Sequence, residues 1–475
     1  MVPEDVHEWS ALEQARALRD GDFSCVDLTR HHLERTHRLN PAVGAFAHVA
    51  DEQALAQARD VDRALATRDV PEHSPLFGCV APVKDLDLVA GMPCEFGSQS
   101  MRGFVAPQDA AFVSRMRRAG LVITGKTTTP EFGLPAYTEN DLGHAARTPW
   151  DTQRSAGGSS GGAAAAVAAR LAPLAQGSDG GGSIRIPASV TGLVGIKPSR
   201  GRVSGLPFPP GLGDLAVIGP LARTVADAAA FLDVLAGSDD RDLYGLPTPP
   251  PGSFLTAVDH DPGRLRIGRF TTPMVADTQV DPDALAAVEI TTQLLTELGH
   301  DVVDIDPPID TDAVGAFETV WQVGAAALPL PDDAPLTPLT RHLRTLGAAR
   351  SGVDVAEAIR RMREVSVAAI AATAPYDVLL TPTLAHLPVP LGHFSGREPH
   401  ENFEEQKRFT PFTAPFNVTG QPAMSVPVHH TDGGLPVGVQ LVGRPRDEGT
   451  IIALASQLER AVSWHLRIPD IEGLG

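Results

Sequence analysis

A stretch rich in glycine and serine, from Ser155 to Pro198, constrains this chain more than any other feature. It contains the run Ser-Ala-Gly-Gly-Ser-Ser-Gly-Gly, which begins at Ser155, and the run Gly-Ser-Asp-Gly-Gly-Gly-Ser-Ile-Arg, which begins at Gly177. Glycine loses more conformational entropy on folding than any other residue. Its repeated placement around hydroxyl groups therefore indicates close backbone approach or unusual φ/ψ, and predicts a functional site.

The second run has the composition that a nucleophilic serine requires. A serine that attacks a carbonyl needs a base for its proton and N–H donors for the oxyanion that forms. Gly180, Gly181 and Gly182 allow successive amides to converge on one point, and Ser183 follows them directly. A flexible loop of small residues is the alternative, but the apolar residues from Ile184 to Val190 favour a constrained site.

Length and charge restrict the class of protein. The chain has 475 residues, of which 43% are hydrophobic, and this is enough for one large α/β core. It carries 39 basic and 58 acidic residues, a formal net charge of −19. This balance argues against nucleic acid and anionic membranes as partners. A small-molecule substrate is the expectation that remains.

The cysteines and histidines give no sign of a disulfide framework or a metal site. Cys25, Cys79 and Cys94 are odd in number and widely spaced. The histidines between His31 and His37 lie on a charged helical pattern, which is more typical of a solvated face. The chain begins without a signal-peptide pattern, and no apolar run is long enough to span a membrane. We therefore expect a cytoplasmic protein that uses no metal or other cofactor.

Lysine is rare in this chain, which draws attention to Lys84. Only four of the 39 basic residues are lysines, and an arginine cannot act as a base. Lys84 lies in an apolar, strand-like run, where a charge is costly unless it has a partner. A catalytic base and a buried ion pair with Asp85 or Asp87 are equally compatible with this context.

Two familiar motifs match this chain in residue identity, but the residues around them do not favour the structure that each motif requires. Residues 120–127 fit the P-loop pattern, but Leu121–Thr124 has the composition of a strand, and the prolines and glycine that follow exclude the required helix. Gly157–Gly161 fits the nucleophile elbow of α/β hydrolases, yet the residues before it have the composition of a loop. We therefore expect neither function from these motifs.

Hydrophobic spacing predicts alternating helices and strands, and hence an α/β fold. The predicted strands include the one around Lys84 and one over Leu265–Phe270. The predicted helices cover Leu12–Arg19, Val26–Leu39 with a stop at Asn40-Pro41, Ala50–Thr67, Gly161–Leu171, the part of Val217–Leu235 after a break at Gly219-Pro220, and Asp281–Leu298.

Taken together, the motifs of this chain resemble those of the amidase signature family of hydrolases. The resemblance spans nearly the whole sequence and rests on ordered motifs: Pro82-Val-Lys-Asp, Gly-Gly-Ser-Ser-Gly-Gly from Gly157, Gly-Ser-Asp-x-Gly-Gly-Ser-Ile-Arg from Gly177, Gly-Ile-Lys-Pro from Gly195, and Asn417-Val-Thr-Gly-Gln-Pro-Ala. It implies one large mixed β-sheet flanked by helices, within a single domain over residues 1–475. A helical segment over about residues 1–70 would pack against this domain.

The resemblance also implies roles for individual residues. Ser183 would be the nucleophile, Ser159 a bridging serine on a cis peptide bond, and Lys84 the base. The backbone amides of Gly180, Gly181, Gly182 and Ser183 would form the oxyanion hole. Departures from the family pattern, such as Gly180 where Thr or Ile is commoner, remove no catalytic group.

Substrate, pocket and assembly remain open at this stage. The proline-rich segment Val323–Thr345 is expected to be irregular, and either shapes the pocket or forms a surface loop. His386 or His393 could supply an alternative base. The leading function is hydrolysis of small aliphatic, aryl or cyclic amides. The alternatives are an amidase subunit of a tRNA-dependent amidotransferase, an esterase or acyltransferase, and a non-catalytic protein on the same scaffold. A homodimer is compatible with the sequence.

Overall fold

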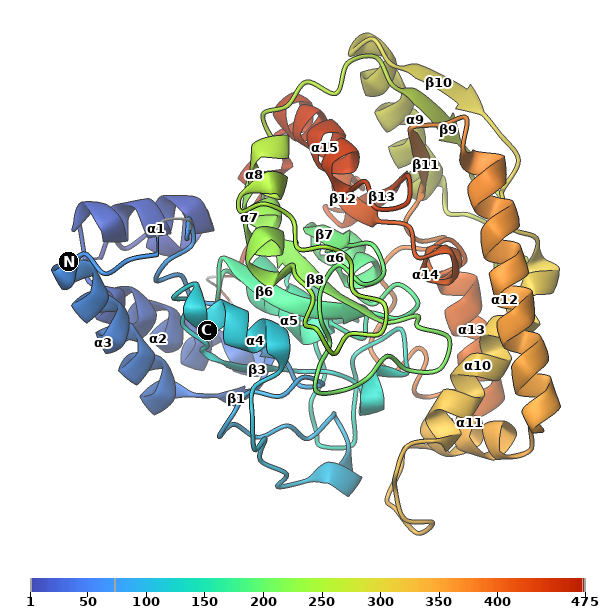
Figure 1. Ribbon diagram of the computed structural model, residues 1–475, viewed down its shortest axis with the longest axis horizontal. Coiled ribbons are helices and arrows are strands. Elements are labelled where there is room, and N and C mark those ends of the chain that lie inside the picture. Colours follow the sequence, from blue (N-terminus) through green and yellow to red (C-terminus); the bar gives the residue numbers. More distant parts are fainter. Residues whose placement is uncertain (1, 72–73, 472, 474–475) are drawn as a thin grey trace.

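A mixed β-sheet of eight strands forms the centre of the computed structural model, which describes residues 2–71, 74–471 and 473 (Figure 1). The strand order is β10-β9-β11-β13-β12-β7-β8-β6. Strand β9 is parallel to both of its neighbours, and all the other pairs are antiparallel. The strands are β6 (Leu174–Asp179), β7 (Val194–Lys197), β8 (Val217–Ala222), β9 (Arg266–Arg269), β10 (Asp301–Asp304), β11 (Val378–Pro382), β12 (Ala423–His430) and β13 (Pro436–Gly443).

Helices cover both faces of this sheet, and the expected α/β architecture is confirmed. Helices α7, α9 and α15 pack on one face, while α5 and α6 pack on the other. Because both faces are covered, β13 is buried along its whole length. The helices are α1 (Ala11–Asp20), α2 (Cys25–Val43), α3 (Asp51–Thr67), α4 (Ala111–Arg118), α5 (Gly161–Ala168), α6 (Arg185–Thr191), α7 (Val225–Leu235), α8 (Ser253–Ala257), α9 (Pro282–Glu297), α10 (Val314–Ala326), α11 (Pro338–Ala348), α12 (Gly352–Thr373), α13 (Pro399–Phe409), α14 (Pro415–Thr419) and α15 (Glu448–Val462).

A small second sheet carries Lys84. Its strands, in the order β1-β3-β2, are β1 (Phe46–Val49), β3 (Gly125–Thr127) and β2 (Val83–Lys84). Helix α5 contacts this sheet as well as β6 of the large sheet. The glycine and alanine residues of α5 allow close packing between the two sheets. A Cβ on Gly162, for example, would lie only 2.4 Å from the backbone nitrogen of Thr128.

The P-loop match is not a phosphate site. The predicted strand over Leu121–Thr124 lies a few residues too early, because regular pairing begins only at Gly125 in β3. The Lys126 side chain is buried and donates hydrogen bonds to the Asp85 carboxylate and to the Asp87 carbonyl. The next element is only the short 3-10 helix Glu131–Gly133.

The described helices depart from the predicted ones at several ends. Helix α2 continues through Pro41 to Val43, because Gly44 ends it in the left-handed conformation while the Asn40 side chain bonds the backbone of Phe46. Gly219 and Pro220 lie inside β8 opposite β6, so the break comes later, at Arg223 and Thr224.

Two loop predictions are wrong for a shared reason, namely that local composition hid regular structure. The residues before the serine cluster form the hairpin β4 (Arg147–Thr148) and β5 (Asp151–Ser155), outside the large sheet. Within Val323–Thr345, only residues 327–337 are irregular. The flanking residues belong to α10 and α11, which pack against each other beside α12 and α13 (Figure 1).

The described part of the chain has no helix long and apolar enough to cross a membrane. Within the same residues, no group of three or more His, Cys, Asp or Glu side chains is arranged to hold a metal ion.

Candidate active site

Lys84 is fully buried between the two sheets and points at serine hydroxyls. Its backbone N–H donates to the Gln176 side-chain oxygen at 2.9 Å, which ties β2 to β6. Its Nζ donates to Ser159 Oγ at 2.8 Å and to Ser178 Oγ at 3.1 Å. The predicted proximity of Lys84 and Ser159 is therefore present in the structure.

The surroundings of Lys84 favour its neutral form. Burial lowers the pKa of this amine from 10.5 to about 7, against the opposing influence of the Asp87 and Asp179 carboxylates. An ion pair between Lys84 and Asp85 is not formed, because Asp85 pairs with Lys126 at 3.2 Å. The Asp87 carboxylate accepts a hydrogen bond from the Gln176 amide instead of from Lys84.

Ser159 lies at the start of α5, after a cis peptide bond between Gly158 and Ser159. The site has no room for a side chain at Gly158, where a Cβ would lie 2.5 Å from the backbone of Tyr137. The Ser159 carbonyl accepts a hydrogen bond from the Thr129 hydroxyl at 3.2 Å. Ser159 is 2% exposed, so its hydroxyl faces the protein interior rather than solvent.

Ser183 ends the glycine loop between β6 and α6. Its backbone carbonyl accepts a hydrogen bond from the Ser160 N–H at 3.2 Å, which holds the two serine runs together. It is 8% exposed, more than Ser159, and it lines a pocket. Of the two serines, Ser183 is therefore the one that a bound small molecule can reach.

The glycine loop is shaped by a buried carboxylate. Asp179 accepts hydrogen bonds from the backbone N–H groups of Gly182 at 2.8 Å and of Ile184 at 3.1 Å. It also pairs with Arg185 at 2.8 Å, with both side chains fully buried. The Arg185 guanidinium, together with Lys197 and Asn417, holds the pKa of Asp179 well below its usual range despite burial.

Arg185 extends this network to the C-terminal part of the chain. Its guanidinium donates to Gln440, to Asn417 and to the Thr413 carbonyl. From the sequence, Asp179 and Arg185 were recognised only as parts of a motif, and neither was given a role of its own. Their charges within an otherwise small and apolar run were the signal that a buried ion pair holds the loop.

The pocket beside Ser183 has an empty volume of about 580 Å³. Its walls come from the segment Leu134–Ala136, from α10 and from α13, and Gly181 lies among the lining residues. Two aromatic residues of α10, Phe317 and Trp321, stack at a centroid distance of 5.4 Å and line it. Sequence reasoning missed them, because the predicted pocket segment began just after them.

The two candidate histidines lie elsewhere. The His386 ring contacts the Thr278 hydroxyl at 3.1 Å, and the His393 ring packs on Phe394. Neither residue lines the pocket of Ser183. The part of the chain that the structure describes thus brings Lys84, and no predicted histidine, to the serine cluster.

The fold and the site define an α/β enzyme with a buried lysine and two serines beside a ligand-sized pocket. A family model described as Amidase matches residues 27–452. The chain therefore belongs to the amidase family and is an amide hydrolase.

Similar proteins carry related activities in their names. The 6-aminohexanoate-cyclic-dimer hydrolase of Paenarthrobacter ureafaciens is 34% identical over 97% of this chain and 96% of its own length. The solved structure of a 6-aminohexanoate cyclic dimer hydrolase complexed with substrate has a TM-score of 0.90 and 32% identity, over 98% of this chain and 99% of that chain. A bacterial aryl acylamidase has a TM-score of 0.86 and 26% identity, over 97% and 98% of the two chains.

Proposed function

We propose that this chain hydrolyses the C–N bond of small carboxylic amides through an acyl-enzyme on Ser183. The observation that carries the proposal is the 2.8 Å hydrogen bond between Lys84 Nζ and Ser159 Oγ, made by an amine whose pKa is lowered to about 7. A neutral lysine at this position can accept a proton near neutral pH. Linear, aryl and cyclic amides all fall within the proposed substrate class.

The proposed proton path begins at the hydrogen bond between Lys84 and Ser159. Lys84 takes the proton of Ser159, and Ser159 takes the proton of Ser183 as its Oγ attacks the carbonyl carbon. When the tetrahedral intermediate collapses, the C–N bond breaks and Ser159 delivers a proton to the leaving amine. Ser159 is then reprotonated by the Lys84 ammonium. Water repeats the same steps on the acyl-enzyme and releases the carboxylic acid.

The oxyanion hole belongs to the glycine loop. We assign the stabilising donors to the backbone N–H groups of Gly180, Gly181 and Ser183, for which no acceptor is found in the described part of the chain. The resemblance also placed the Gly182 N–H in the oxyanion hole. We assign it an indirect contribution, because this N–H already donates to the Asp179 carboxylate. Each donor of this kind typically lowers the barrier by about 3–4 kcal/mol.

Membership of a tRNA-dependent amidotransferase complex is the main alternative. A solved glutamyl-tRNA(Gln) amidotransferase subunit, from Thermotoga maritima, has a TM-score of 0.81 and 28% identity, over 99% of both chains. An esterase would form the same acyl-enzyme from an ester, and an acyltransferase would pass the acyl group to an acceptor other than water. The functions therefore differ in whether the isolated chain hydrolyses amides, hydrolyses only esters, or transfers the acyl group to another acceptor.

The test combines labelling with turnover. The purified chain is incubated with a fluorophosphonate, and its intact mass is compared with that of Ser183→Ala, which we expect to remain unlabelled. In parallel, a panel of aryl and aliphatic amides is assayed with both proteins and with Lys84→Ala. We expect the Lys84→Ala variant to lose roughly 10²–10⁴-fold in kcat/KM at pH 7.

Full activity of Lys84→Ala at pH 7 would refute the assigned base. An unlabelled wild-type chain that turns over no amide would favour the amidotransferase complex. Turnover of the matching esters without turnover of any amide would favour the esterase, and acyl transfer to an added amine in preference to water would favour the acyltransferase.

A further inference from the structure

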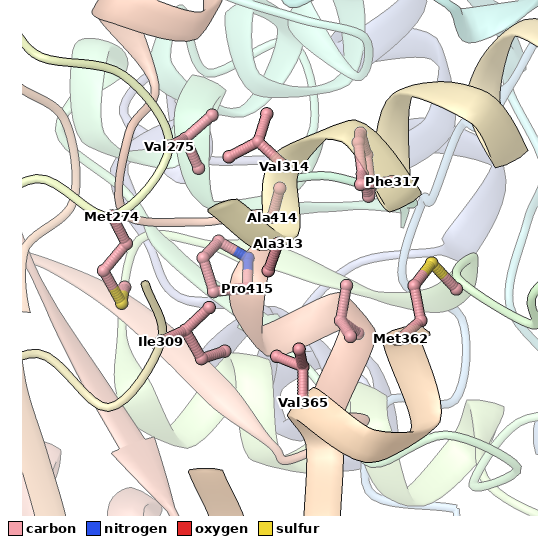
Figure 2. A pocket seen from close by; sticks show the side chains of 11 residues that line it. Met274, Val275, Ile309, Ala313, Val314, Phe317, Met362, Val365, Ala414 and Pro415 are labelled. Carbon is pink, nitrogen blue, oxygen red and sulfur yellow. The ribbon is translucent and has the colours of Figure 1, made fainter. Parts of the chain in front are cut away.

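A second, wholly apolar cavity adjoins the pocket of Ser183. The empty space within it, part of which is open to solvent, is about 410 Å³, and every side chain that lines it is apolar (Figure 2). Met274 and Ile309 come from the segments around β9 and β10, whereas Met362 and Val365 come from α12. All four are at least nine-tenths buried. We refer to this cavity as the apolar chamber.

The apolar chamber shares one wall with the Ser183 pocket. Val275, Val314, Phe317 and Ala414 line both spaces. The same wall meets the glycine loop, since a Cβ on Gly181 would lie 3.5 Å from the Phe317 ring and 3.9 Å from the Ala414 side chain. A molecule bound at Ser183 therefore lies next to the chamber, with only this wall between them.

The chamber lies away from the side on which the leaving amine is expected. Ser159 must deliver its proton to that amine, and Ser159 Oγ lies 3.3 Å from where a Cβ on Gly133 would be. The segment Leu134–Ala136 follows directly and lines the Ser183 pocket, but none of it lines the chamber. An amine that takes its proton from Ser159 would lie beside residues 134–136, which leaves the chamber as the site for the acyl part.

Charged side chains line the Ser183 pocket but not the apolar chamber. Lys407, which pairs with Glu318 at 2.5 Å and with Glu404 at 2.6 Å, lines the Ser183 pocket but not the chamber. A charged group in the chamber would lose its hydration and find no partner. Two methionines, whose side chains adapt to flexible ligands, suit an unbranched chain.

We propose that the apolar chamber binds an aliphatic acyl chain, so that this amidase prefers amides of straight-chain fatty acids over short acyl amides. The proposal rests on the proposed function, because it takes the acyl group to be the one held on Ser183. It narrows the substrate class from small amides in general to amides of straight-chain fatty acids. It also makes Val365 and Met362 specificity-determining residues.

The first experiment measures kcat/KM for acetyl, butyryl, hexanoyl and octanoyl p-nitroanilides. Burial of each methylene is expected to raise kcat/KM roughly fourfold until the chamber is full. In Val365→Phe the added ring fills the chamber, and the ratio of octanoyl to acetyl kcat/KM should collapse toward one. The matched control is Val367→Phe on the same helix, whose side chain is 71% exposed, and which should keep the wild-type ratio.

Met362→Ala supplies a second variant if Val365→Phe does not fold. Its shorter side chain enlarges the chamber, so the plateau should move to longer chains. Equal kcat/KM for all four anilides in the wild-type enzyme would overturn the proposal. A gain that instead follows the length of the amine, as in N-butyl against N-octyl acetamide, and that Val365→Phe abolishes, would place the leaving group in the chamber and also overturn it.

Binding separates this inference from the proposed function. Calorimetry with the Ser183→Ala variant compares octanamide with butyramide and needs no turnover. Tighter binding of octanamide, lost on adding Val365→Phe, supports the chamber even if no amide is hydrolysed. Equal affinity for the two amides overturns it, even if Ser183 is labelled by the fluorophosphonate and the enzyme is active.

Discussion

At the residue scale, the chemistry of this protein depends on how few charges are left near Lys84. Asp85, the nearest carboxylate in sequence, is held by Lys126, and Asp87 is bonded by Gln176. The lysine amine consequently meets hydroxyl groups rather than a carboxylate. Because no carboxylate pairs closely with this amine, burial lowers its pKa to about 7.

This arrangement predicts the pH dependence of amide hydrolysis. Because the neutral amine accepts the proton, kcat/KM should fall as the pH drops below about 7, where Lys84 becomes protonated. Asp87 raises the pKa of Lys84, so Asp87→Asn should lower that pKa and move the acidic limb to lower pH. Steady-state kinetics with an uncharged amide across a pH series tests both shifts. An acidic limb that stays in place in Asp87→Asn would contradict this electrostatic link.

The pair between Asp179 and Arg185 predicts a large effect on stability. Asp179→Asn removes one charge from a fully buried pair and leaves the Arg185 guanidinium without its counter-charge. Breaking such a pair typically costs about 3–5 kcal/mol of unfolding free energy, which urea denaturation would measure. Glu364→Ala, which breaks the exposed pair with Arg360 on α12, is the control and should change little. Equal midpoints for the two variants would show that the pair does not hold the loop.

At the scale of elements, the pocket depends on helices that pack closely against one another. Helix α10 supplies Phe317 and Trp321 to the pocket, and α11 packs against it. The contact depends on Gly347, where a Cβ would lie 2.0 Å from the Gln322 carbonyl oxygen. The position of the pocket wall is thus set by one close approach between two helices.

Two matched glycine substitutions test this helix contact. Gly347→Ala should lower the unfolding free energy and disturb substrate binding, because α11 has to move away from α10. Gly324→Ala, in α10 itself, meets no atom within 4 Å and should stabilise the protein by about 0.5–1 kcal/mol. Thermal unfolding and KM measurements on both variants make the comparison. A stabilising Gly347→Ala would show that the close approach does not matter.

At the scale of the whole molecule, all three cysteines lie inside the protein, each in a different hydrophobic cluster. Cys25, Cys79 and Cys94 are buried and free. Burial raises the thiol pKa to about 12 for Cys25 and for Cys94, and well above its usual value for Cys79. Thiol reactivity therefore reports on unfolding of the whole chain.

We expect Ellman's reagent to detect no thiol in the native protein at pH 8 and all three in denaturant. The thiolate is the reactive form, and burial both suppresses it and blocks access. The urea dependence of labelling should follow that of the circular dichroism signal. A thiol that reacts in the native protein as fast as free cysteine would reveal local opening at that site.

Prediction from the sequence succeeded where local composition and neighbouring residues decide the structure. The helices predicted over Ala50–Thr67 and Asp281–Leu298 correspond to α3 and α9, and the α/β class followed from the alternation of patterns. It failed where distant parts of the chain override local signals. Pro41 is tolerated within α2, Pro220 lies inside a strand, and α10 lies partly in a segment whose later prolines predicted a loop.

The sequence by itself determined the chemical groups of this protein, the hydroxyls of Ser159 and Ser183, the glycine loop and the rare lysine, because these depend only on residue type and short-range order. Only the tertiary structure decided that Lys84 bonds Ser159 and Ser178 rather than Asp85, that burial lowers the pKa of its amine to about 7, and that α10 and α12 supply the pocket wall and the apolar chamber. The physical reason is that a pKa and a cavity are set by burial and by distances between segments far apart along the chain.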